Sequence, residues 1–171
     1  KDKETINQFL RLSSFAEMML IHENALVKVD PEVPFEQLAL IGCSVTTGLG
    51  AVLKTARIEA GSTVAVIGCG GVGLSAIQGA RIAGALRIIA IDTVGSKLEM
   101  ALSHGATDTI SATAGDVVQN VIEMTNGGVD YSFDALGLKQ TAEQSYDMVR
   151  AGGTATIVGL IAEGVKIELD G

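Results

Sequence analysis

A buried apolar run that leads into three regularly spaced glycines constrains this chain more than any other feature. The predicted strand 63–68 ends on the first glycine of a Gly-x-Gly-x-x-Gly motif, which Gly70 and Gly73 complete. A helix is predicted over 72–83, and a second buried strand over 87–92 ends in an acid 24 residues after Gly68. Strand, glycines, helix, strand and acid in this order predict a βαβ unit that binds a dinucleotide.

Each residue of the motif has a physical task in such a unit. Gly68 permits a tight turn, Gly70 lets the main chain approach a pyrophosphate, and Gly73 lets the helix pack closely on the strand. The following helix directs unpaired N–H groups and its positive dipole end at the phosphates. Asp92, at the end of the second strand, can accept hydrogen bonds from both ribose hydroxyls of an adenosine.

Strands and helices alternate from about residue 62 onward. The other predicted strands are 107–110, 129–134 and 154–158. The other predicted helices are 96–103, 116–125 and 139–149. Short strands separated by helices of this length predict an α/β fold with a doubly wound parallel sheet and right-handed crossovers.

The composition agrees with that fold class and disfavours some partners. The chain has 171 residues, of which 47% are hydrophobic and 21 are glycine, and it has no tryptophan. Such a length can enclose a core, and buried parallel strands need this apolar character. The net charge of −8 disfavours nucleic acid or an anionic membrane as a partner.

The cysteines and the N-terminal residues indicate the cellular compartment of the protein. Cys43 and Cys69 are the only cysteines and show no disulfide pattern, so we expect a reducing, cytoplasmic setting. Residues 1–4 are charged and lack a signal-peptide core. The uncharged stretch 60–80 is long enough to cross a bilayer, but its six glycines and its polar residues make it a poor membrane span.

The two ends of the chain differ from the alternating middle. Strands are predicted over 15–22 and 25–29, followed by a helix over 35–41, Gly42, and a longer helix over 43–57. Residues 163–170 alternate apolar and polar side chains, which is typical of a half-buried strand. Neither end has a partner sheet of its own, so we expect the chain to be part of a larger protein.

With these features together, the chain resembles the zinc-dependent medium-chain alcohol dehydrogenases. The resemblance rests on residues 15–17, 23–29, 42–48, 68–73 with Asp92, 126–133 and 157–159. It implies that residues 1–34 are the remnant of a β-rich, GroES-like catalytic domain. Residues 35–171 are then a Rossmann domain that binds NAD and is truncated before its last strand.

The resemblance also implies roles for individual residues. Cys43 matches one of three protein ligands of a catalytic zinc, and Thr47 matches a residue beside the nicotinamide. The pyrophosphate turn comprises Gly68, Gly70, Gly71, Val72 and Gly73. Asp92 and Lys97 match the pair around the adenosine ribose. Two segments match those that line the cofactor. They are Ala135, Leu136 and Gly137 after the fourth strand, and Val158, Gly159 and Leu160 after the fifth.

For the intact parent, the family implies NAD-dependent oxidation of alcohols to aldehydes or ketones by hydride transfer. The remaining zinc ligands and the proton relay are absent from this chain, so beyond Cys43 we expect no catalytic residue and no turnover. The carboxylate of Asp92 would repel a 2′-phosphate, and no arginine follows at Thr93 or Val94, which favours NAD over NADP. The family further implies a homodimer through residues 165–169.

Three alternatives stay open at this point. The glycine motif could be an ordinary strand–helix loop, or the chain could be an NAD-binding module without chemistry. Ile-Gly-Cys-Gly followed by a strand ending in an acid also resembles an adenosylmethionine-dependent methyltransferase. Such enzymes usually carry an acid on the first strand just before the glycines, where this chain has Val66 and Ile67.

Overall fold

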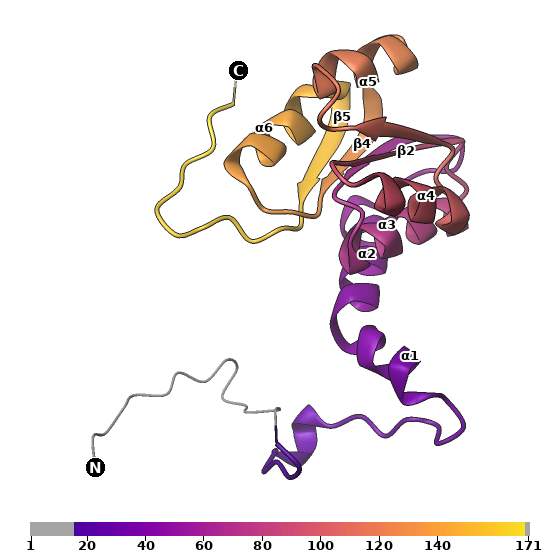
Figure 1. Ribbon diagram of the computed structural model, residues 1–171, viewed down its shortest axis with the longest axis vertical. Coiled ribbons are helices and arrows are strands. Elements are labelled where there is room, and N and C mark those ends of the chain that lie inside the picture. The colour runs from indigo at the N-terminus through magenta and orange to yellow at the C-terminus, as the bar shows by residue number, and fades with distance from the viewer. Residues whose placement is uncertain (1–15, 170–171) are drawn as a thin grey trace. The chain divides into compact units, whose positions relative to one another are not determined.

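The computed structural model describes residues 16–169, and Figure 1 shows its helices and strands. The chain divides into two compact units, Lys1–Phe35 and Glu36–Gly171. The predicted boundary lies between residues 34 and 35. That the first unit derives from a catalytic domain stays a prediction.

Five parallel strands form the sheet of the second unit, as predicted. They are β1 (Thr63–Ile67), β2 (Arg87–Asp92), β3 (Asp108–Ser111), β4 (Val129–Asp134) and β5 (Val149–Ile157). Their order in the sheet is β3-β2-β1-β4-β5. The order reverses between β1 and β4, which is where ligands bind in open α/β sheets. Ile67 of β1 is in register with Ile91 of β2 and with Asp134 of β4.

Helices cover both faces of this sheet. They are α3 (Gly71–Ile82), α4 (Gly95–His104), α5 (Val117–Thr125) and α6 (Lys139–Asp147). Val66 belongs to a core cluster with Ile77 of α3, whereas its neighbour Ile67 belongs to a second cluster with Val121 of α5. Successive residues of a strand point to opposite faces, so both must be apolar. In Figure 1, α3 and α4 lie together, and α5 and α6 lie on the other side of the strands.

The last strand and the helix before it differ from the prediction in their bounds. β5 begins at Val149, five residues before the predicted start, and α6 ends at Asp147. The sequence predicts that Gly152 and Gly153 close the helix 139–149, but both lie within β5, Gly152 with φ of +77°. The register between β4 and β5 shifts between Val129 and Tyr131, so the strand continues through an irregularity.

The helix before β1 is continuous, whereas the sequence predicts two helices separated at Gly42. It consists of α1 (Phe35–Leu40), the π-helical η2 (Ile41–Val45), α2 (Thr46–Gly50) and the π-helical η3 (Ala51–Ala56). By length and composition alone, Phe35–Ala56 could cross a membrane, with a mean hydropathy of 1.5. Close packing of α2 on α3 accounts for part of this apolar character. A Cβ at Gly48 would lie 2.3 Å from the carbonyl oxygen of Val72.

The predicted strands at the two ends are wrong. Residues 16–34 contain the short 3-10 helix η1 (Glu23–Ala25) and no strand, and Phe15 lies outside the described residues. Residues 163–169 are also without a strand, and Asp170 lies outside the described part. Leu26 has an extended backbone, with φ −112° and ψ 140°, but a strand also requires a partner to bond. The sequence pattern reports the local conformation and not the presence of that partner.

Candidate cofactor site

The glycine turn has the geometry that the motif predicts. Gly68 has φ of +93°, a conformation that L side chains rarely adopt. A Cβ at Gly73 would lie 1.7 Å from the carbonyl oxygen of Gly68, so only glycine allows α3 to pack on the turn. A Cβ at Gly70 would meet no atom of the described residues within 4 Å. The main chain at Gly70 therefore faces open space that a ligand can enter.

The amino end of α3 is suited to an anion. The helix begins at Gly71, and Gly70, its N-cap residue, provides no side-chain cap. The N–H group of Leu74 donates to the carbonyl oxygen of Gly70 at 2.8 Å. The earlier N–H groups, including those of Gly71 and Val72, have no acceptor within the helix. Together with the positive end of the helix dipole, these N–H groups suit a phosphate group.

Asp92 joins the glycine turn to the end of β2. The residue is 7% exposed. Its Oδ2 accepts a hydrogen bond from the N–H of Cys69 at 2.8 Å, and its Oδ1 accepts one from Val94 at 3.0 Å. The Lys97 ammonium lies 3.9 Å from Oδ2. A carboxylate has about four acceptor positions, so two remain for ribose hydroxyls, and the predicted pair is brought together.

Cys69, within the turn, is a packing residue. Its thiol is buried, and Sγ lies 3.7 Å from the carbonyl oxygen of Ile91. Burial, with a smaller contribution from the charge of Asp92, raises the pKa of the Cys69 thiol from 9.0 to about 12. The thiol is therefore protonated at neutral pH and is not a nucleophile.

The loops that follow β4 and β5 lie against each other and against the glycine turn. A Cβ at Gly159 would lie 2.0 Å from the nitrogen of Gly137, and one at Gly137 would lie 2.5 Å from the nitrogen of Leu160. A Cβ at Gly68 would lie 2.8 Å from Cγ of Leu136. The predicted segments 135–137 and 158–160 thus meet beside the turn, at the carboxyl ends of the strands.

Asp134, which sequence reasoning missed, organises this meeting. The residue is fully buried at the end of β4. Its carboxylate accepts hydrogen bonds from the N–H groups of Leu136 and Gly137, both at 3.1 Å. Its carbonyl oxygen accepts hydrogen bonds from Val158 at 2.8 Å and Gly159 at 2.9 Å. Like Asp92, it is an acid at the end of a buried strand, and that signal could have identified it.

Thr47 lies in a pocket with the end of β5. The pocket has a volume of about 470 Å³. Its lining comprises Thr46, Thr47, Gly50, Ala51, Lys54 and Thr55 from the helix, and Thr156, Ile157 and Val158. The structure therefore brings Thr47 and Val158, two predicted cofactor residues, to one opening.

The described residues form no zinc site around Cys43, the predicted metal ligand. Its side chain is exposed and free on η2. Within residues 16–169, no group of three or more His, Cys, Asp or Glu residues could hold a metal ion. A catalytic zinc needs three protein ligands, so the residues described here do not by themselves fit zinc.

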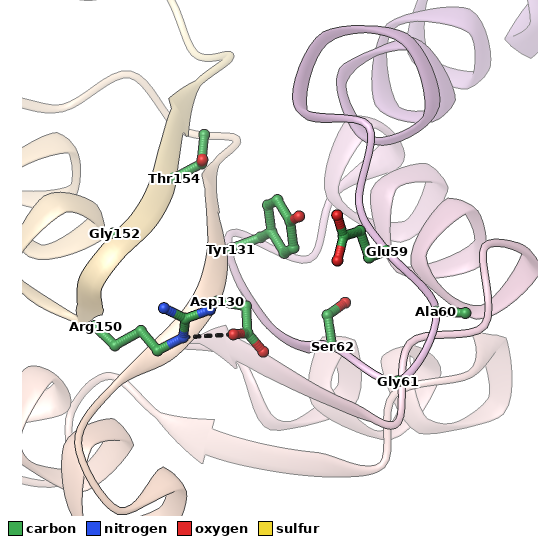
Figure 2. A pocket seen from close by; sticks show the side chains of 9 residues that line it. All are labelled: Glu59, Ala60, Gly61, Ser62, Asp130, Tyr131, Arg150, Gly152 and Thr154. Atoms are coloured by element: carbon green, nitrogen blue, oxygen red, sulfur yellow. Dashed lines mark hydrogen bonds and ion pairs between the residues drawn. The ribbon is translucent and has the colours of Figure 1, made fainter.

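A second pocket opens at the opposite edge of the sheet, where β1 and β4 begin (Figure 2). Its volume is about 250 Å³. Asp130 accepts hydrogen bonds from the main-chain N–H of Thr63 at 2.7 Å and from Nε of Arg150 at 2.6 Å. Among the described residues, the Ser62 hydroxyl is the one buried side-chain polar atom without a hydrogen-bond partner. This pocket is separate from the glycine turn, which follows the other end of β1.

Comparison with known proteins identifies the family of this chain. The profile of a family described as zinc-binding dehydrogenase matches residues 71–170. The chain is 41% identical over 170 residues to S-(hydroxymethyl)glutathione dehydrogenase of Saccharomyces cerevisiae. That alignment covers 96% of this chain and 44% of the yeast protein. The chain thus spans less than half the length of this curated relative.

Solved structures show the same fold at substantial identity. Benzyl alcohol dehydrogenase from Acinetobacter calcoaceticus superposes with a TM-score of 0.89 at 37% identity, over 95% of this chain and 45% of that one. A zinc-binding dehydrogenase from Sinorhizobium meliloti 1021, solved bound to NADP, has a TM-score of 0.70 at 36% identity. Its alignment covers 75% of this chain and 38% of that chain.

Proposed function

Because the chain belongs to the zinc-binding medium-chain alcohol dehydrogenase family and corresponds to its nucleotide-binding portion, we propose that it holds NAD for the oxidation of an alcohol. The observation that carries the proposal is the glycine turn, with open space at Gly70 and Asp92 hydrogen-bonded to Cys69. NAD supplies the hydride-accepting nicotinamide, and the protein supplies binding and orientation.

The proposed positions follow from the two ends of the site. Gly71 and Val72 hold the pyrophosphate at the amino end of α3, and Asp92 with Lys97 holds the adenosine ribose. Thr47 and Val158, which line one pocket, place the nicotinamide. The reaction class is conversion of an alcohol to an aldehyde or ketone. The names of the yeast and Acinetobacter relatives, which specify S-(hydroxymethyl)glutathione and benzyl alcohol, support that class.

We propose NAD rather than NADP as the cofactor. Two main-chain N–H groups and Lys97 hold the Asp92 carboxylate at the end of β2. A 2′-phosphate placed there would meet a like charge at close range. The family includes a structure bound to NADP, so NADH and NADPH must be compared directly.

We propose that the whole protein, rather than this chain alone, binds a catalytic zinc. Cys43 would supply one ligand there, and the other ligands would come from outside the described residues. We expect this chain alone to bind NAD without oxidising alcohols. An alcohol-oxidation assay after zinc addition tests this, and turnover by the isolated chain would contradict it.

We also propose that residues 165–169 form a homodimer contact. Val165, Ile167 and Leu169 alternate with polar residues and are 38–47% exposed, which suits pairing with a second copy. Sedimentation of the chain at micromolar concentration should give the mass of a dimer, and substitution of Ile167 by lysine should give the mass of a monomer. A monomeric wild-type chain would contradict the proposal.

The decisive experiment is a binding titration with NADH and adenosylmethionine. We expect NADH to bind and adenosylmethionine not to bind, because buried Val66 and Ile67 occupy the place where methyltransferases usually carry an acid. Binding of adenosylmethionine alone would replace the proposed function. Gly70→Ala, which places a methyl group at the approach to the pyrophosphate, provides the control for binding at the turn.

A further inference from the structure

Asp134 is the point at which the loops after β4 and β5 are fixed to each other. Its side chain bonds the first loop, and its main-chain carbonyl oxygen bonds the second. We propose that Asp134 is a positioning residue that presents these loops to the nicotinamide half of the cofactor. The inference rests on the proposed function, and it concerns a fully buried residue whose carboxylate bonds the first loop.

At Gly137 and Gly159 the two loops meet through their main chains, where no side chain can lie between them. Gly137 and Gly159 approach so closely that a Cβ on either would lie within 2.5 Å of the other loop's main chain. The carboxylate of Asp134 is instead the acceptor for two N–H groups of the first loop, at 3.1 Å each. Without that acceptor, those N–H groups would lose their bonds in a site that is closed to solvent at Asp134.

The position of Asp134 in the sheet explains why its effect should be confined to one half of the cofactor. Asp92 ends β2 on one side of β1, and its carboxylate bonds Cys69 in the glycine turn. Asp134 ends β4 on the other side, next to the loops proposed for the nicotinamide. The two acids therefore support different loops. Losing one should not disturb the bonds that the other makes.

The test compares NADH with ADP-ribose, which carries the adenosine, the pyrophosphate and a second ribose but lacks nicotinamide. In Asp134→Asn, an amide replaces one acceptor oxygen with a donor that opposes the loop N–H groups. We expect the dissociation constant for NADH to rise on the order of tenfold. The dissociation constant for ADP-ribose should stay within about twofold, since its partners at Asp92 and α3 are unchanged.

The matched control is Asp130→Asn, at the other end of the same strand. Asp130 also accepts a main-chain hydrogen bond, from Thr63, but it lines the opposite pocket (Figure 2). We expect this variant to leave both dissociation constants unchanged. Gly137→Ala is a second test, because it forces the loops apart while the Asp134 carboxylate is retained. It should weaken NADH and not ADP-ribose.

Hydrogen exchange on the ligand-free chain provides a readout that is independent of binding. The amides of Leu136 and Gly137 should exchange faster in Asp134→Asn, and the amide of Cys69 should not. Equal weakening of both ligands, unchanged NADH binding, or unchanged exchange in Asp134→Asn would overturn the inference. A wild-type chain that binds neither ligand would overturn the proposed function, and exchange would still report whether Asp134 fixes the loops.

Discussion

The carboxylate of Asp92 lies 2.8 Å from the main-chain nitrogen of Cys69, so the acid that ends β2 is bonded directly to the glycine turn that follows β1. Asp92, which we propose as the ribose contact, thus also has a structural role in the ligand-free chain. It fixes the turn before any ligand arrives and keeps acceptor positions free. A change at Asp92 should alter both the turn and the proposed ribose contact.

We predict that Asp92→Asn weakens NADH binding by about 10- to 100-fold, since a charged acceptor for a buried N–H and for the ribose is lost. Binding of NADPH should weaken less or improve, because the negative charge that opposes a 2′-phosphate is removed. Fluorescence titration with both cofactors measures the change. Asp116→Asn is the control, as Asp116 accepts a hydrogen bond from Gln119 at the start of α5 and asparagine is also a good N-cap. An unchanged ratio of NADH to NADPH affinity would contradict the assignment.

Gly70 and Gly73 should separate binding from stability. In Gly73→Ala, the new Cβ meets the carbonyl oxygen of Gly68, and we expect a loss of roughly 2 kcal/mol or more in the free energy of unfolding. In Gly70→Ala, the Cβ enters open space with φ of −83°. Stability should therefore stay within about 0.5 kcal/mol while NADH affinity falls, since the methyl group occupies the approach to the pyrophosphate. Urea unfolding and NADH titration of both variants measure the two effects. Equal stability losses would refute the distinction.

The sequence was sufficient for elements whose signals are local. The predicted bounds of β2 and β4 match the structure, β1 ends one residue before its predicted end, and β3 is shifted by one residue at both ends. Buried parallel strands are continuous apolar runs, and glycine or a capping residue marks most helix ends here. Asp116, for example, accepts a hydrogen bond from Gln119 at the start of α5.

Features that depend on distant parts of the chain were not predictable in the same way. Residues 165–169 have the alternation of a strand, but pairing depends on a second strand that the pattern cannot reveal. Gly152 and Gly153 are typical of a turn, yet both lie within β5, which pairs with β4 before and after them. Asp134 looked like an ordinary strand end because its partners are main-chain groups of two loops. That Thr47 and the end of β5 line one pocket could also be seen only in the folded chain.

Thiol reactivity should distinguish the two cysteines. Cys43 is exposed, whereas burial raises the pKa of the Cys69 thiol to about 12. We predict that Ellman's reagent modifies Cys43 in the native chain near pH 8 and reaches Cys69 only after unfolding.

Because the folded pKa of Cys69 is raised, the contribution of this thiol to stability is complete below pH 9, its ordinary pKa, and is lost as pH rises toward 12. Cys69→Ala should remove that part of the alkaline destabilisation. Rapid modification of both thiols in the native chain would contradict the burial of Cys69.

Asp130 should make stability depend on acid pH. Hydrogen bonds from Thr63 lower the pKa of the Asp130 carboxyl below 3.8, and Arg150 adds to the effect. A depressed folded pKa means that the contribution is complete above pH 3.8 and is lost as pH falls through the folded value. We predict that wild type loses stability more steeply below pH 4 than Asp130→Asn, whose stability at pH 7 is lower by about 1 kcal/mol. Urea unfolding from pH 3 to pH 7 measures both slopes.

Arg150→Gln should retain most of the slope, because the main-chain hydrogen bond from Thr63 is the largest cause of the lowered pKa of Asp130. Parallel pH profiles for wild type and Asp130→Asn would show that the carboxylate does not support the start of β1.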